Sequence, residues 1–171
     1  MSIHRFGPEN GSLSVKTTRT GVAAKAGHDL LIEATAWQAT MDATSIVLDV
    51  DATSLRVREG TGGMQALDDD DKTGIAETID QEVLKRQPIA FRSTSVQADG
   101  GRIAVEGELT LNGAMRPIAF ELNVADGRLG GSVVVMQSDW GMSPYSTLFG
   151  TLKVVDEVEV VLDVAWPGQS L

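Results

Sequence analysis

Apolar and polar residues alternate through most of this chain, and this period-two pattern constrains the fold more than any other feature. Successive side chains of a β-strand point to opposite faces, so the alternation indicates strands with one buried face. The clearest run places Ile103, Val105 and Leu109 on one face and Glu106 and Glu108 on the other. Eight candidate strands follow, near residues 13–18, 30–37, 46–51, 89–96, 103–112, 118–125, 133–135 and 158–164.

Short turn motifs connect the later strands. Asp99-Gly100-Gly101, Asn112-Gly113 and Asp126-Gly127 all supply residues that tolerate positive φ, which tight hairpins require. Three such connections in succession predict antiparallel neighbours from about residue 89 to residue 137.

One segment has a helical period instead. Ile75, Ile79 and Val83 recur at i, i+4 and i+8, which predicts a helix over about residues 73–86. Thr73 is the expected N-cap, and Pro88 stops the helix. A shorter helical turn is expected between residues 139 and 150.

Antiparallel strands with one apolar face must bury that face in a sandwich or in a closed barrel, and closure also removes exposed edges. A transmembrane barrel needs an outward apolar face with aromatic girdles, whereas aromatic residues make up only 5% of this chain. We therefore expect a soluble barrel with an apolar interior. No repeat or linker divides the sequence, so residues 1–171 are expected to form a single domain.

Charge and composition exclude several classes of protein. The net charge of −10 disfavours binding to nucleic acid or to anionic membrane surfaces. The absence of cysteine excludes disulfides and thiolate chemistry. No stretch approaches the ~18 apolar residues of a membrane helix. The N-terminus carries no signal-peptide pattern, so a cytoplasmic location is expected, or a periplasmic or secreted one if a leader is missing.

The sequence carries no motif of a catalytic, metal or cofactor site. His28 precedes a strand, and its neighbour Asp29 would point to the opposite face, so the two do not predict a catalytic dyad. The four carboxylates from Asp68 to Asp71 lack the alternate spacing of a calcium loop and are expected to form a solvated loop before the helix. No metal and no cofactor are expected.

The inward face favours a hollow interior. Ala34, Ala36 and Gly107 stand among larger apolar residues, and small side chains inside a barrel either relieve crowding or leave space. Such walls would suit an alkyl or isoprenoid chain, because each buried methylene contributes ~0.8 kcal/mol. A tightly packed, dry barrel remains the alternative at this point.

Three sequence elements resemble the YceI-like family of lipid-binding barrels. Residues 105–122 resemble its "G-x-L-T" hairpin, and residues 82–93 resemble its helix, proline and "I-x-F-x-S" strand. Ser138-Asp139-Trp140-Gly141-Met142, with the strand up to Val164, resembles its "D-[aromatic]-G-[apolar]" turn and closing strand. The resemblance implies an all-β, eight-stranded antiparallel lipocalin-like barrel with one helix, and an apolar tunnel for polyisoprenoid, isoprenoid quinone-like or long-chain acyl amphiphiles. It also implies that a homodimer can form.

The leading hypothesis is a non-enzymatic protein that binds or carries a long-chain isoprenoid or acyl lipid in its barrel. The alternatives are a structural or stress-related interaction protein with a packed barrel, and a small lipid-modifying enzyme that uses His28. The expected tunnel wall comprises Ile32, Ala34, Leu48, Phe91, Val105, Leu109, Phe120, Leu122, Val135 and Leu162. His28, Arg92 and Trp140 are expected at the mouth, near a headgroup.

Overall fold

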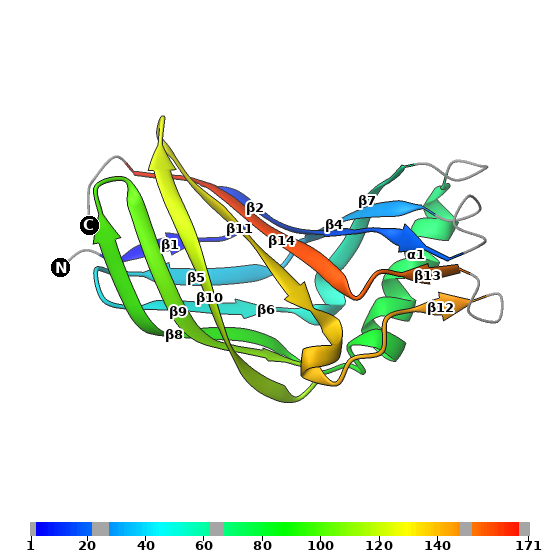
Figure 1. The fold of residues 1–171 in the computed structure, drawn as a ribbon. Helices are drawn as coiled ribbons and strands as arrows, with labels where there is room; N and C mark the ends of the chain where they lie inside the picture. The colour runs from blue at the N-terminus through cyan, green and yellow to red at the C-terminus, as the bar shows by residue number, and fades with distance from the viewer. Residues whose placement is uncertain (1–2, 22–27, 62–66, 148–151, 168–171) are drawn as a thin grey trace.

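The computed structural model describes residues 3–21, 28–61, 67–147 and 152–167, most of which lie in one antiparallel sheet (Figure 1). The strands of this sheet are β1 (His4–Phe6), β2 (Gly11–Thr17), β4 (Asp29–Ala34), β5 (Trp37–Met41), β6 (Ile46–Val50), β7 (Leu55–Thr61), β8 (Ile89–Asp99), β9 (Arg102–Leu111), β10 (Ala114–Ala125), β11 (Arg128–Met136) and β14 (Glu157–Ala165). A second, small sheet contains β12 (Ser146–Thr147), β13 (Leu152–Val154) and β3 (Arg19–Thr20).

The main sheet has eleven strands in the order β1-β5-β6-β8-β9-β10-β11-β14-β2-β4-β7, so the expected count of eight is wrong. The difference arises because three long runs of chain each bend into two strands. These runs are β1 with β2, β4 with β5, and β6 with β7. Each of the eight expected segments corresponds to a strand of the main sheet. The strands of that sheet that the sequence missed, β1, β5 and β7, are each one half of a bent run.

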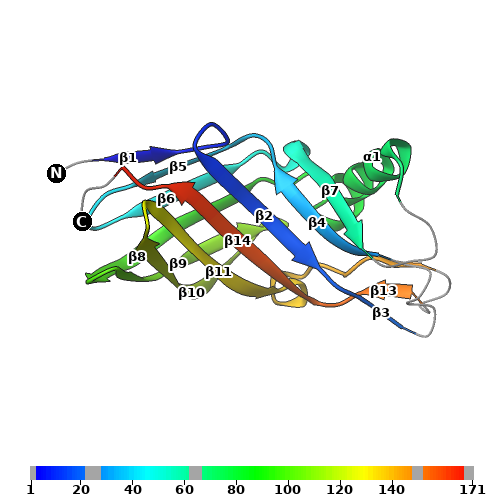
Figure 2. The ribbon, with the colours of Figure 1, turned by 90° about the horizontal axis from the view of Figure 1, so that it is seen from above.

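The bends also let the sheet curl round on itself (Figure 2). Only Thr35 and Ala36 separate β4 from β5. On one side of this bent run, β2 pairs with β4 and β1 pairs with β5. On the other side, β7 pairs with β4 and β6 pairs with β5. The first strand of the order, β1, pairs with β5, and the last strand, β7, pairs with β4. Because β4 and β5 form one run of chain, the two edges of the sheet meet there, which gives the lipocalin-like barrel that the sequence predicts.

A hydrogen-bonded turn forms the bend between β6 and β7. Asp51 caps the 3₁₀ turn Ala52–Ser54, and its carboxylate accepts hydrogen bonds from the Thr53 hydroxyl at 2.6 Å and the Thr53 backbone N–H at 2.9 Å. These two bonds, the hydroxyl first, hold the pKa of Asp51 below its ordinary value. The bend is joined to the other bent run because the Asp51 N–H donates to the Ala36 carbonyl oxygen at 3.0 Å.

The three predicted hairpins are confirmed, and they join β8 to β11 in sequence. Asn112 and Gly113 have φ of 51° and 73°, and Asp126 and Gly127 have φ of 54° and 73°. Two consecutive positive φ angles are the geometry of the type I′ turn, which matches the twist of the flanking strands.

The helix begins four residues before the expected start. Helix α1 spans Asp69–Thr78 and continues into a π-helical turn, Ile79–Val83. Its N-cap is Asp68, whose carboxylate accepts from the Asp71 N–H at 2.7 Å, while the Asp71 carboxylate accepts from the Asp68 N–H at 3.2 Å. The acidic run is thus a capping box and not only a solvated loop. No helix in the described part of the chain has the length and apolarity to cross a membrane.

Gly107 provides the space for one aromatic ring of the interior. A Cβ at this position would lie 2.5 Å from Cζ of Phe91 and also against the carbonyl oxygen of Arg92. The Phe91 ring therefore packs directly on the Gly107 backbone, and it also contacts the Phe120 ring at a centroid distance of 5.3 Å.

We expect Gly107→Ala to lower the free energy of unfolding by about 1–3 kcal/mol, because the added methyl would clash with both the Arg92 carbonyl oxygen and the Phe91 ring. Gly74→Ala is the matched control, since a Cβ there meets nothing within 4 Å. That helical substitution should stabilise the protein by up to about 1 kcal/mol. Urea unfolding of the two variants gives both values, and equal effects would contradict the packing of Phe91 on Gly107.

Candidate functional site

The inner face of the barrel encloses a cavity of about 1060 Å³. This volume lies at the upper end of the ~300–1,000 Å³ range of small-molecule pockets. Its walls come from alternate residues of successive strands and from the inner side of α1. Wall residues include Leu13, Val15, Leu30, Ile32, Ala34, Ile46, Leu48, Val50, Ile89, Phe91, Leu109, Leu111, Ile118, Phe120, Leu122, Val133, Val135, Val158, Val160 and Leu162.

Solvent access within the barrel shows that this space is hollow. Val15, Val133 and Val160 occupy one row across three neighbouring strands and point inward, yet each keeps part of its surface accessible. Leu48 and Leu162 do the same. Inward side chains of a packed barrel would be fully buried, so the accessible surface of these five side chains indicates an unfilled interior.

Side chains fill one end of the barrel, on the left of Figures 1 and 2, where β1 lies. Its core contains the four most deeply buried large side chains, Ile103, Val105, Leu129 and Val164, which are at most 2% exposed. An aromatic group that includes Phe6 and Trp166, with ring centroids 6.3 Å apart, adds to the same core. The cavity is therefore closed at this end of the barrel.

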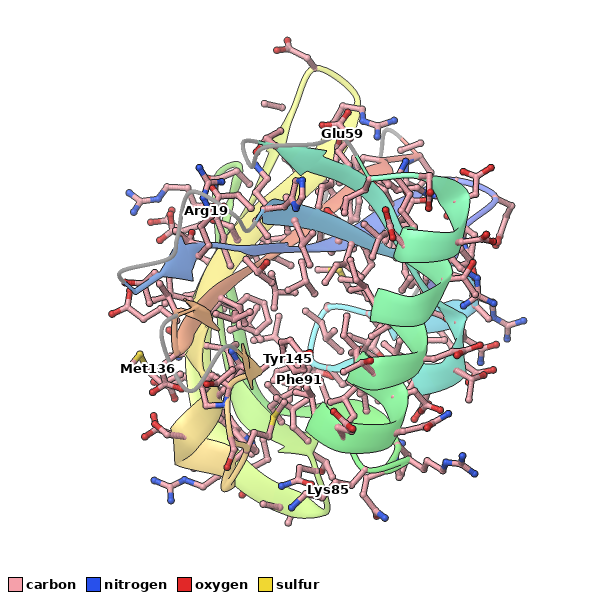
Figure 3. All side chains as sticks on the ribbon, turned by 90° about the vertical axis from the view of Figure 1, so that its right-hand side faces the viewer. Arg19, Glu59, Lys85, Phe91, Met136 and Tyr145 are labelled. Carbon is pink, nitrogen blue, oxygen red and sulfur yellow. The ribbon has the colours of Figure 1, made fainter. Side chains whose placement is uncertain are left out.

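The opposite end of the barrel is covered by α1 and is polar. Figure 3 looks into this end and shows α1 along one side of the opening and Arg19 on the other. We call this end the mouth and define it by Arg19, His28, Asp70, Asp71 and Tyr145, all of which line the cavity. No side chain of α1 itself is fully buried, because the helix lies over a hollow.

Arg19 is held in place at the mouth by hydrogen bonds. Its guanidinium donates to the Thr61 carbonyl oxygen at 2.8 Å and lies 3.5 Å from the Asp29 carboxylate. That carboxylate also accepts the Arg19 backbone N–H at 2.9 Å. Nearby on the inner face, the hydroxyl oxygen of Thr17 is buried and has no hydrogen-bond partner among the described residues. The mouth thus combines the carboxylates of Asp70 and Asp71 with the paired cation of Arg19. The Thr17 hydroxyl lines the same cavity.

The structure brings most of the expected tunnel residues together. Nine of the ten line the cavity, namely Ile32, Ala34, Leu48, Phe91, Leu109, Phe120, Leu122, Val135 and Leu162. Val105 faces the same interior but lies in the closed end, outside the lining. Alternation predicts the face to which a strand residue points, and it carries no information about depth along the barrel.

Of the three residues expected at the mouth, the structure places only His28 in the cavity lining. Arg92 points outward, because it follows the inward-facing Phe91 on the same strand. On the outer face its guanidinium lies 3.2 Å from the Asp49 carboxylate.

Trp140 is also outside the cavity lining, and its indole braces the barrel wall. It lies in a 3₁₀ turn, Gln137–Trp140, slightly before the position at which the sequence suggested a helical turn. The side chain is 4% exposed, and its indole N–H donates to the Leu109 carbonyl oxygen at 2.8 Å. The Asn112 amide in turn donates to the Trp140 carbonyl oxygen at 3.3 Å.

The small inward residues have three different roles. Ala34 lines the cavity, as expected for a hollow interior. Ala36 is exposed at the bend between β4 and β5, so its assignment to the inner face is wrong. Gly107 is buried, and the Phe91 ring fills the space beside it. Only Ala34 therefore contributes to the hollow.

Several cavity residues were not among the expected site residues. Ile75, Ile79 and Val83 point from the helix into the cavity, and the i, i+4, i+8 spacing was the signal that could have identified them. Leu67 precedes α1 and also lines the cavity, but it carries no periodic signal. Within the described ranges, no three metal-ligating side chains come close enough together to hold a metal ion.

We expect Trp140→Phe to lower the free energy of unfolding by about 1–2 kcal/mol more than a matched control, because it removes a buried hydrogen bond. Trp37→Phe is that control, since the Trp37 side chain is equally buried and its indole nitrogen has no partner among the described residues. Thermal or urea unfolding measures both. Equal losses would show that the bond to Leu109 contributes nothing.

Comparisons with known proteins agree with this architecture. A family model for the YceI-like domain matches residues 6–166. The crystal structure of BcnA from Burkholderia cenocepacia is similar with a TM-score of 0.58 at 15% sequence identity, covering 89% of this chain and 94% of that one. A YCEI protein from Campylobacter jejuni is similar with a TM-score of 0.59 at 12% identity, covering 81% of this chain and 85% of that one. At these identities the likeness shows the fold alone. No protein with a curated description matches the chain.

Proposed function

Because the chain belongs to the YceI-like family, we propose that it binds a long-chain apolar ligand in its barrel: a polyisoprenoid, an isoprenoid quinone-like molecule or a fatty acyl amphiphile. The observation that carries the proposal is the cavity of about 1060 Å³ with its aliphatic walls. A cavity of this size argues against the packed-barrel alternative, in which side chains would fill the interior.

The physical chemistry of the walls favours a flexible apolar chain. Each methylene that leaves water contributes ~0.8 kcal/mol, so about ten methylenes supply roughly 8 kcal/mol before the cost of ordering the chain. Outside the mouth, the lining has few polar residues, namely Thr17, Thr78, Ser132 and Gln137. Discrimination between ligands therefore comes from chain shape and from the polar mouth.

The mouth supports a neutral polar headgroup in preference to an anionic one. Asp70 and Asp71 carry negative charge there, and the only cation among the mouth residues, Arg19, is engaged by Asp29. A phosphate or carboxylate head would be repelled by the two aspartates. An alcohol or carbonyl head could instead accept or donate hydrogen bonds at the Thr17 hydroxyl, which has no partner among the described residues.

The same mouth gives little support for catalysis, and we propose a binding role. His28 lines the cavity, and its sequence neighbour Asp29 is engaged by Arg19. Loss of turnover in His28→Ala with ligand binding retained would instead favour the lipid-modifying enzyme. The cytoplasmic location and the homodimer remain predictions, which cell fractionation and the solution mass of the protein would test.

Narrowing the cavity should abolish ligand uptake without unfolding the barrel. Leu48→Trp and Leu162→Trp each place an indole in the hollow, where both leucines keep accessible surface. The indole displaces several methylenes of ligand, so we expect affinity for a pyrene-labelled long-chain alcohol to fall about ten-fold or more.

Fluorescence titration of the pyrene probe gives the affinities, and circular dichroism reports folding. Ala104→Trp is the control, because Ala104 is exposed on the outer face of β9, and this variant should bind like the parent protein. If both folded cavity variants bound the probe with the parent affinity, the ligand would not occupy this cavity.

A further inference from the structure

The wall of the barrel is not continuous between β10 and β11. These strands pair at only three positions, from Asn123 with Gly130 to Ala125 with Arg128. By contrast, β10 pairs with β9 at ten positions, and β11 pairs with β14 at nine. Beyond the shared hairpin the two strands diverge (Figure 1). Residues 114–122 of β10 and 131–136 of β11 face each other without residue pairs, and we call this region the seam.

The local sequence accounts for the separation. Pro117 lies within the seam and has no backbone N–H to donate to a neighbouring strand. Gly131 lies where the pairing stops, and a Cβ there would lie 2.5 Å from the Glu121 carbonyl oxygen. A side chain at position 131 would therefore clash with β10, and the residue pairs between the two strands end at Gly130, just before this position.

Fixed structure closes the seam at both ends. At one end is the type I′ turn of Asp126 and Gly127. At the other end the 3₁₀ turn Gln137–Trp140 connects to β9 through the bond from the Trp140 indole to the Leu109 carbonyl oxygen. On its other side, the Gln137 N–H donates to the Asp156 carbonyl oxygen at 3.0 Å. The seam is thus a window in the wall and not a frayed edge.

The cavity lining on β11 differs from that on the other long strands. On the other long strands of the wall, such as β2, β4, β6, β10 and β14, the cavity-lining residues alternate, as a closed wall requires. On β11 the lining residues are Gly131, Ser132, Val133 and Val135, so an outward-pointing residue is included. Ser132 is exposed to solvent and borders the cavity at the same time.

The outer surface near the seam is unusually apolar. Only four large hydrophobic side chains of the described residues are exposed: Ile3, Met115, Val134 and Tyr145. Met115 on β10 is 65% exposed, and Val134 on β11 is 57% exposed, so one lies on each strand that borders the seam. Tyr145 lines the mouth. Of the four exposed side chains, two therefore lie on the strands of the seam and one lies at the mouth.

We propose that the seam is a second, lateral entrance of the cavity, through which the apolar chain of the ligand passes between the barrel and its surroundings. The proposal rests on the proposed function for the identity of the ligand. With two openings, the barrel accepts chains longer than its own cavity, because the end of the chain extends past Ser132 while the headgroup stays at the mouth. Such a lateral opening requires that β10 and β11 pair over only part of their length, as they do.

The first experiment tests the opening without any ligand. The chain has no cysteine, so a single introduced thiol reports one site. Val133→Cys and Val15→Cys lie in the same row of inward residues, joined through Val160, and only Val133 borders the seam. A sulfonated maleimide should modify Val133→Cys at least ten-fold faster than Val15→Cys. Equal rates would show that reagent enters only by the mouth, and they would overturn the lateral entrance.

The second experiment tests the occupant. Saturation with the pyrene-labelled alcohol should slow maleimide modification of Ser132→Cys at least five-fold and leave Ala104→Cys, on the closed wall of β9, unchanged. If the probe binds and Ser132→Cys stays fully reactive, no ligand chain passes the seam.

A second copy of the chain could instead cover the seam. In that case, diluting the protein without probe would raise the reactivity of Ser132→Cys, and this result would also overturn the proposal. If the parent protein does not bind the probe, the proposed function fails, while the first experiment still decides whether the seam is open.

Discussion

The burial of one apolar face per strand is the interaction on which the rest of this structure depends. A sheet whose strands alternate in this way has to turn its apolar face away from water, and curling into a barrel does this while removing most exposed edges. The bends between β4 and β5 and between β6 and β7 make the curvature possible. Asp51 fixes one of these bends through hydrogen bonds from Thr53.

Closure leaves more space than the side chains can fill, and the unfilled volume is concentrated at one end. Ile103, Val105, Leu129 and Val164 pack the end where β1 lies. Toward the mouth the corresponding positions point into a hollow, and α1 covers them without burying any side chain of its own.

The sequence predicted directions better than depths. Nine of the ten expected wall residues line the cavity, since the period of two that selected them follows from strand geometry alone. Alternation could not separate Val105 from Leu109, because only the assembled barrel determines how far along the axis each residue lies. Trp140 was expected at the mouth for a similar reason, because its hydrogen bond to Leu109, 31 residues away, is visible only in the assembled barrel. The helix start was misplaced because Asp68, and not Thr73, is the N-cap, through the capping box that it forms with Asp71.

The central claim is that the cavity holds a long apolar ligand. Native mass spectrometry of the freshly purified protein, with solvent extraction of whatever co-purifies, tests this claim most directly. We expect a discrete added mass that is lost on denaturation and is recovered in the extract as a long-chain isoprenoid or acyl compound. A mass equal to that of the bare chain, unchanged after incubation with polyprenyl and fatty acyl compounds, would contradict it.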